Sequence, residues 1–265
     1  MYKYLHNSQS STNIDEKLKI SINERLKKRG IYSDFIEFGS EKELASILAE
    51  MKKQTTNTLV IVGDDNDFNI LMGQIGKLDS EIAIGYLPIA KSRLSKKFKL
   101  NSWQDAVEAL AQRRIKEKTL YSISSRYFYD LIELDFDKSA NSEPINIKTD
   151  KNLELKLPKC KLRFENLNED RYFSKTPIQL IAYHPKPENQ VNTKTPLLNK
   201  IINKIKNDEE SDIGELILSL HSKNFKAESH TAAIDSLGRK FNQSFGIGKT
   251  TKTIRFISKR PDRQK

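Results

Sequence analysis

The chain has 265 residues, of which 37% are hydrophobic and 8% aromatic, which is enough apolar material for one or two folded domains. It carries 46 Lys and Arg against 35 Asp and Glu, a net charge of +11, and its one cysteine, Cys160, excludes an intramolecular disulfide and a cysteine-based zinc cluster. No apolar run approaches the roughly 20 residues of a membrane-spanning helix, and the N-terminus lacks the apolar core of a secretion signal. We therefore expect a protein of the reducing cytoplasm.

The first half of the chain alternates predicted strands with predicted helices. Short apolar runs predict strands at Lys3–His6, Ile31–Phe38, Thr58–Val62 and Ile82–Leu87. Apolar residues at helical spacing predict helices over Ile14–Leu26, 41–53, Phe68–Ile75 and Trp103–Ile115, with Ser40 and Ser102 in capping positions. This alternation predicts a mostly parallel sheet with helices on both faces.

The pattern changes near Tyr121, where period-2 alternation takes over. Antiparallel strands are predicted at Asp130–Phe136, Leu153–Leu157, Cys160–Phe164, Ile178–Ala182, Ile213–Leu220, Phe225–Ser229 and Thr253–Ser258. One helical stripe, Leu197–Ile205, interrupts them. The predicted fold class is α/β, with an N-terminal mostly parallel sheet and flanking helices in residues 1–125. A C-terminal β-rich, antiparallel domain is predicted in residues 126–265.

Positive charge gathers in two segments. Residues 249–265 hold seven bases and one acid, and residues 91–99 hold five bases and no acid. Such segments can hold the phosphate groups of a nucleic acid, a nucleotide or a lipid head group, and the alternative is that they are merely solvated. Nucleic acid ranks last among these ligands, because Phe256 is the one aromatic residue of the tail and base stacking needs more.

Several well-known nucleotide and catalytic motifs are absent. Gly246–Thr251 looks like a P-loop, but Gln243 stands where that loop needs a glycine, so we predict a turn between strands. The sequence offers no Rossmann glycine fingerprint, no metal-ligand spacing among its four histidines and no hydrolase elbow. No catalytic triad can be assigned.

The turn after the third predicted strand, Gly63–Asn69, carries three acids. Ligands of open parallel sheets bind beyond the carboxyl ends of the strands, which is where this turn is expected. Asp64, Asp65 and Asp67 can hold Mg²⁺ through carboxylate oxygens. The same residue types also suit a helix N-terminus, where exposed amides and the helix dipole favour acids, and both interpretations stay open.

This turn and the segment Ile84–Ile89 together resemble the catalytic domain of diacylglycerol and sphingosine kinases, lipid kinases related to NAD kinases. That family carries Gly-Gly-Asp-Gly-Thr-x-Asn-Glu after one strand and Gly-Thr-Gly-Asn-Asp after the next. The matching residues are Gly63, Asp65 and Asn69 in the first motif, Gly85 and Pro88 in the second strand, and Asn7 in the opening turn. Asp64 and Asn66 replace glycines of the first motif, and Ala90–Arg93 replaces the second.

The resemblance implies a nucleotide site and two possible functions. ATP would lie against Asn7, Gly63, Asp64, Asp65, Asn66, Asp67, Asn69, Lys91 and Arg93, with Asp65 nearest to Mg²⁺; no general base is assigned. One function is ATP-dependent phosphorylation of a lipid hydroxyl. The alternative is a catalytically degenerate relative that binds a nucleotide, an anionic membrane surface or a protein partner. A peripheral location at the membrane is compatible with either function. A homo-oligomer is compatible with either.

Overall fold

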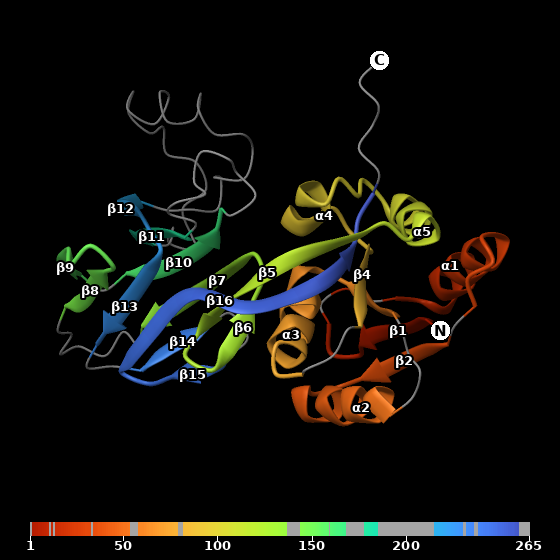
Figure 1. Cartoon of the computed structure of the whole chain (residues 1–265), viewed down its shortest axis with the longest axis horizontal. Helices are drawn as coiled ribbons and strands as arrows, with labels where there is room; N and C mark the ends of the chain where they lie inside the picture. Colours follow the sequence, from red (N-terminus) through yellow and green to blue (C-terminus); the bar gives the residue numbers. More distant parts are fainter. Residues whose placement is uncertain are drawn as a thin grey trace, which may run out of the picture. The chain divides into compact units, whose positions relative to one another are not determined.

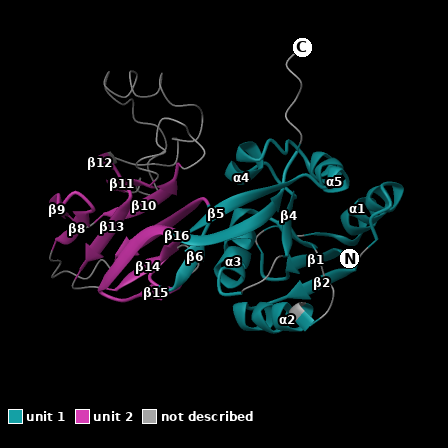
Figure 2. Ribbon diagram, viewed as in Figure 1, with its two compact units in different colours: residues 1–121, 125–129, 250–265 teal, residues 122–124, 130–249 magenta. Residues whose placement is uncertain are grey.

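The chain forms two compact units (Figure 2). The computed structural model describes every residue except 1, 11, 13, 33, 54–57, 79–81, 137–143, 159, 168–177, 185–214, 230–231, 236–237 and 260–265. Unit 1 comprises residues 1–121, 125–129 and 250–265, and unit 2 comprises residues 122–124 and 130–249. The division into functional domains at residue 125 stays a prediction. Within the described part of the chain, no helix combines the length and apolar character that crossing a bilayer takes.

Unit 1 is a parallel sheet with helices (Figure 1). Its strands follow the order β2 (Phe35–Phe38), β1 (Tyr2–Asn7), β3 (Thr58–Gly63), β4 (Ala83–Pro88) and the end of β16 (Ser244–Ile257). Its helices are α1 (Glu16–Lys28), α2 (Glu41–Lys53), α3 (Asp65–Ile75), α4 (Arg93–Lys97) and α5 (Trp103–Gln112). β5 (Ile115–Ile123) pairs with β6 (Arg126–Phe128) and with β16.

Helices cover both faces of the sheet of unit 1. The Tyr2 hydroxyl of β1 donates to the carbonyl of Leu110 in α5, whereas the Asn7 amide of the same strand donates to Asp67 in α3. Because residues of opposite parity point to opposite faces of a strand, α5 and α3 lie on opposite faces. α1 packs against α5, and α2 packs against α3. The predicted parallel sheet with flanking helices is therefore confirmed.

Several predicted boundaries in unit 1 were wrong. The first helix begins at Glu16, after the capping residue Asp15, and not at Ile14. The second strand begins at Phe35 and not at Ile31. The helical stripe from Trp103 does not reach Ile115: α5 ends at Gln112, and Arg113 adopts a left-handed conformation with φ 49° that terminates the helix. Ile115 is 41% exposed and opens β5, so its apolar side chain has no part in the core-facing stripe of α5.

An aromatic cluster joins the C-terminal strand to the core of unit 1. Phe256 of β16 stacks on Phe98, which follows α4, with ring centroids 4.1 Å apart. Phe98 also stacks on Tyr129 at 5.5 Å, and Phe68 of α3 meets the edge of the Tyr86 ring at 5.3 Å. β16 pairs in parallel with β4 through Arg255 and Phe256. The end of β16 is therefore a structural part of unit 1, which the basic composition of residues 249–265 did not indicate.

Unit 2 contains two groups of antiparallel strands. One follows the order β12 (Glu215–Ser222), β11 (Ile178–His184), β10 (Lys161–Asn166), β7 (Leu131–Phe136), β14 (Ala233–Asp235) and β15 (Lys240–Phe241). The other runs from the first part of β16 through β13 (Asn224–Glu228) and β8 (Ile145–Thr149) to β9 (Glu154–Leu157). Phe164 of β10 meets Phe225 of β13 with centroids 5.7 Å apart, so the two groups face each other across an aromatic core.

The β-rich, antiparallel second half is confirmed, with two corrections. The strand predicted at Thr253–Ser258 is the end of β16; it belongs to unit 1 and not to the antiparallel half, and it pairs in parallel with β4. Gly246–Thr251 is not a turn but lies inside β16, where Phe245 and Ile247 are buried at alternate positions and pair with β13. This period-2 burial is that of a half-buried strand, and the two glycines occupy its other face. The predicted helix over Leu197–Ile205 lies outside the described residues.

Candidate functional site

The acidic turn after β3 forms the start of α3. Asp64 is the residue before the helix, and its Oδ1 accepts hydrogen bonds from the backbone N–H groups of Asn66 at 2.9 Å and Asp67 at 3.0 Å. In return, Oδ2 of Asp67 accepts from the backbone N–H of Asp64 at 3.0 Å. This reciprocal capping satisfies amides that the first turn of a helix leaves without partners.

Asp67 is the buried centre of the turn. Its side chain is 1% exposed, and its carboxylate also accepts from Asn7 Nδ2 at 2.9 Å and from Ser10 Oγ at 2.7 Å. Burial raises the pKa of Asp67, while the hydrogen bonds from Ser10, from the Asp64 backbone and from Asn7 oppose that shift. Donors from within the chain thus satisfy this buried carboxylate.

Gly63 makes room for that carboxylate. A Cβ atom at residue 63 would overlap the Asp67 carboxylate at a separation that real Cβ atoms do not show, and the backbone at Gly63 has φ +156°. The absence of a side chain at Gly63 therefore allows the Asp67 carboxylate to pack against the backbone of residue 63.

The segment after β1 folds over the start of α3. Thr12 Oγ1 donates to Asp64 Oδ2 at 3.3 Å, and Ser10 holds Asp67 as described above. The Ser8 backbone N–H donates to the Phe38 carbonyl at 2.9 Å, which ties the segment to β2. Sequence reasoning named Asn7 and missed Ser10 and Thr12. The run of hydroxyl residues directly after the first strand was the signal available for them.

The Asp65 carboxylate contacts a different part of the chain, namely β4 and the start of α4. Its Oδ1 accepts from the Tyr86 hydroxyl at 3.0 Å, and its Oδ2 accepts from the backbone N–H of Leu94 at 3.1 Å. Tyr86 is 2% exposed, and its pKa is raised by burial and, to a smaller extent, by the Asp65 charge. The structure therefore brings the acidic turn and the start of α4 together, although they are far apart in sequence.

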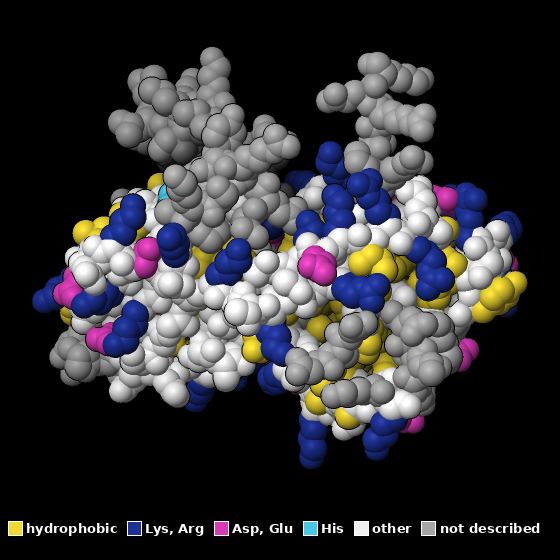
Figure 3. All heavy atoms as spheres, in the orientation of Figure 1, with side chains coloured by type: hydrophobic (Ala, Val, Ile, Leu, Met, Phe, Trp, Pro, Cys, Tyr) yellow, Lys and Arg dark blue, Asp and Glu magenta, His cyan; other side chains and the backbone are white. Residues whose placement is uncertain are grey.

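The basic segment 91–99 is built around α4. Ser92 caps the helix, its Oγ accepting from the Ser95 N–H at 3.1 Å, while Ser95 Oγ accepts from the Ser92 N–H at 2.8 Å. Lys97 lies over the Tyr129 ring at 5.2 Å from its centroid. The exposed bases of the segment are Lys91, Lys96 and Lys99. Figure 3 shows Lys and Arg side chains gathered over the surface where Figure 1 places α4.

The remaining predicted site residues lie on α3. Asn66 is exposed in its first turn, and Asn69 is half-buried one turn from Asp65. Asn69 Oδ1 is buried and accepts no hydrogen bond from the described residues. Arg93, the first residue of α4, is half-buried beside Leu94, which contacts Asp65.

The aspartates do not form a shared metal site. Both oxygens of Asp64, of Asp65 and of Asp67 accept hydrogen bonds from within the chain. Over the described ranges, no three His, Cys, Asp or Glu side chains lie together as metal ligands would. Mg²⁺ needs several oxygens converging on one point, and the three aspartates do not converge in this way. Nothing in the structure tests Asp65 as a single metal ligand, which stays a prediction.

Comparison with known proteins identifies the fold. No protein-family model and no curated protein sequence matches the chain. A diacylglycerol kinase from Bacillus anthracis str. Sterne is similar in structure, with a TM-score of 0.66 and 9% identity over 97% of this chain and 96% of that one. An NAD kinase from Archaeoglobus fulgidus in complex with ATP has a TM-score of 0.57 and 14% identity over 97% and 94%. The expected likeness to these kinases is confirmed for the fold.

Proposed function

We propose that this chain is a protein of the kinase fold that binds phosphate-bearing ligands through residues 91–99 and does not transfer phosphoryl groups. The observation that carries the proposal is the use of the three aspartates as internal caps. Asp64 and Asp67 cap α3, and Asp65 caps the start of α4, at the carboxyl edge of the sheet. Catalysis of phosphoryl transfer depends on metal ions, open amides and bases around the phosphates.

Charge repulsion at the first turn of α3 opposes the binding of a nucleoside triphosphate there. Two like unit charges 4 Å apart repel by about 4 kcal/mol at an effective dielectric constant of about 20. A phosphate placed against the first turn of α3 would meet Asp64, Asp65 and Asp67, whose oxygens already hold internal donors. Side chains at positions 64 and 66 also obstruct the close backbone approach that glycine allows.

The basic segment offers an alternative place for phosphate. Residues 91–99 hold five bases without an acid, and three of the five are exposed. Bases near an anionic lipid surface contribute about 1 kcal/mol each. The shared ligand chemistry is a phosphate group, carried by a lipid head group at a membrane surface or by a free nucleotide.

An active ATP-dependent lipid kinase is the second candidate. It is favoured by the likeness to the diacylglycerol kinase structure over 97% of this chain. Such an enzyme would use ATP with Mg²⁺ and would need a carboxylate base near the accepting hydroxyl. Both oxygens of Asp65 already accept hydrogen bonds from Tyr86 and Leu94, and among the described residues no three His, Cys, Asp or Glu side chains lie together as metal ligands would, which is why this candidate ranks second.

The test compares binding with turnover. We expect the full chain to sediment with vesicles of phosphatidylglycerol and phosphatidylcholine, or to bind ATP in calorimetry, and to show no Mg²⁺-dependent phosphorylation of diacylglycerol in mixed micelles. Replacing Lys96 and Lys99 together by Glu should weaken binding at least about tenfold. The control reverses Lys27 and Lys28, exposed at the end of α1, which should change binding far less.

Each outcome decides between the candidates. Binding to vesicles without binding to ATP assigns the phosphate to a lipid surface, and the reverse result assigns it to a nucleotide. Turnover in the wild type that Asp65→Asn abolishes would overturn the proposal in favour of the kinase. Equal losses in both double variants would show a response to net charge alone, and would also overturn it.

A further inference from the structure

Asp65 was predicted as a ligand of Mg²⁺, but its contacts indicate a structural role. Its carboxylate joins the acidic turn at the start of α3 to the basic segment 91–99. The residue lies in the first turn of α3, and the basic segment begins 26 positions later in the chain. Oδ2 of Asp65 accepts from the Leu94 N–H at 3.1 Å, and Oδ1 accepts from the Tyr86 hydroxyl at 3.0 Å. Tyr86 Oη also lies 3.4 Å from Ser92 Oγ. One carboxylate thus connects α3, β4 and the start of α4.

α4 depends on such anchors for its placement. It has five residues, far fewer than the roughly 12 to 15 that an isolated helix needs for stability in water. Leu94 and Phe98 are buried beneath it, which leaves Lys91, Lys96 and Lys99 on the exposed side. The local Ser92–Ser95 capping closes the first turn but does not attach it to the sheet. The burial of Leu94 and Phe98 holds α4 by apolar contacts, and the Asp65 carboxylate adds a polar anchor at the backbone of Leu94, at the start of the helix.

We infer that Asp65 is a positioning residue: it clamps the start of α4 so that the basic segment 91–99 is presented in one fixed orientation to a phosphate-bearing ligand. This inference rests on the proposed function for its ligand and on the Asp65 contacts for its geometry. Hydrogen bonds to an ionised carboxylate are shorter and stronger than those between neutral groups, which suits a clamp. Asparagine has nearly the same size, but only its carbonyl oxygen accepts hydrogen bonds and its NH2 group does not, so it can satisfy only one of the two donors in the present geometry.

The direction in which Asp65→Asn changes anion binding distinguishes a residue that positions α4 from one that acts only through its charge. Removing an acid beside five bases makes the surface more positive, so electrostatics alone predicts equal or tighter anion binding by Asp65→Asn. The clamp predicts the opposite, because a loosened α4 must be ordered again when the ligand binds. The expected change is about fivefold weaker vesicle binding, independent of Mg²⁺.

The experiment measures the clamp and the binding separately on the full chain. Hydrogen exchange followed by mass spectrometry reports on residues 91–99, where Asp65→Asn should speed exchange about tenfold. Sedimentation with vesicles of phosphatidylglycerol and phosphatidylcholine reports binding. Tyr86→Phe removes one hydroxyl of the same network and should shift both readouts in the same direction by less, which keeps the test valid if Asp65→Asn does not fold. Glu50→Gln, an exposed acid of α2, controls for the change in net charge.

The outcomes separate this inference from the proposed function. Faster exchange in residues 91–99 together with weaker vesicle binding supports the clamp. Unchanged exchange in both Asp65→Asn and Tyr86→Phe overturns it. Wild-type binding that Asp65→Asn leaves equal or tightens also overturns it, since the residue then acts as a charge. If the wild type binds neither vesicles nor inorganic phosphate, the proposed function fails, while exchange alone decides whether Asp65 holds α4.

Discussion

At the scale of single residues, Gly63 and Asp67 form an interdependent pair. Asp67 cannot move aside for a larger residue at position 63, because Asn7, Ser10 and the Asp64 backbone hold its carboxylate. A Cβ at Gly63 would overlap that carboxylate. Overpacking of this kind costs about 1 to 3 kcal/mol, and backbone strain adds a similar amount.

We therefore expect Gly63→Ala to lower the free energy of unfolding by about 2 to 4 kcal/mol, measured by urea denaturation. The matched control is Gly246→Ala in β16. A Cβ there would find the Phe225 carbonyl oxygen at 3.9 Å as its nearest neighbour, which is an ordinary contact. If both variants unfold at the urea concentration of the wild type, the Asp67 carboxylate is not held as described.

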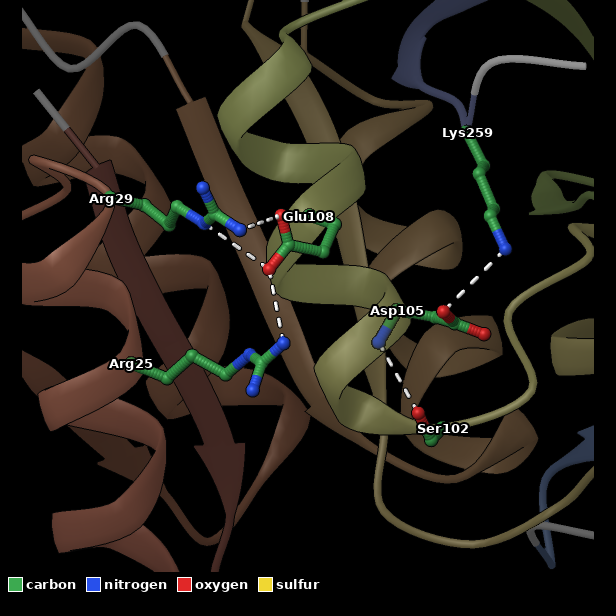
Figure 4. A network of polar contacts seen from close by, with 6 residues as sticks. All are labelled: Arg25, Arg29, Ser102, Asp105, Glu108 and Lys259. Carbon is green, nitrogen blue, oxygen red and sulfur yellow. Dashed lines mark hydrogen bonds and ion pairs between the residues drawn. The ribbon is translucent and has the colours of Figure 1, made fainter.

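At the scale of elements, α5 shows how local capping and distant ion pairs combine (Figure 4). Ser102 Oγ accepts from the Asp105 N–H at 3.2 Å and begins the helix. Glu108 of α5 pairs with Arg25 of α1 at 3.1 Å and with Arg29 at 2.7 Å. These side chains are partly exposed, so each pair contributes less than the cap does.

Replacing Ser102 by Ala should destabilise the protein by about 1 kcal/mol, because one amide of the first turn loses its acceptor. Thermal unfolding followed by the fluorescence of Trp103, the first residue of α5, reports on this helix directly. Ser46→Ala is the control, since Ser46 lies exposed inside α2, where alanine is the better helix former. A drop in stability of the same size in both variants would contradict the capping role.

At the scale of the whole molecule, β16 contributes to both units. Its first part pairs with β13 in unit 2, and its end pairs with β4 in unit 1. Ile254, Phe256 and Ile257 are buried in the core of unit 1. Removing one buried Phe or Ile costs about 2 to 5 kcal/mol, and total stabilities are about 5 to 15 kcal/mol.

Deleting residues 250–265 should therefore abolish cooperative unfolding of unit 1, seen as loss of the Trp103 fluorescence transition. Deleting residues 260–265 is the control, because it leaves the described end of β16 intact. The control should unfold within a few degrees of the full chain. A chain lacking residues 250–265 that still unfolds cooperatively at the wild-type temperature would show that β16 is dispensable for unit 1.

Periodicity and capping motifs in the sequence predicted the fold class and most of the described helices and strands of unit 1. Helix and strand periodicities and the Ser40 capping box depend on residues a few positions apart, and α2 begins and ends where they predicted. Charge and motif spacing likewise located the acidic turn and the basic segment. The boundary at Ile115 failed because apolar spacing alone does not show where a chain leaves the helix, which here happens through the backbone conformation of Arg113.

Only the tertiary structure shows which groups surround the acidic turn. The sequence left Asp64, Asp65 and Asp67 open between a metal site and helix caps. The capping amides of α3 are local, but the other donors to Asp65 and Asp67 come from distant segments. Asn7 is 60 positions from Asp67, and Leu94 is 29 positions from Asp65. Local spacing carries no information on which amides and hydroxyls will converge on a carboxylate, because that depends on how strands from different parts of the chain align at one edge of the sheet.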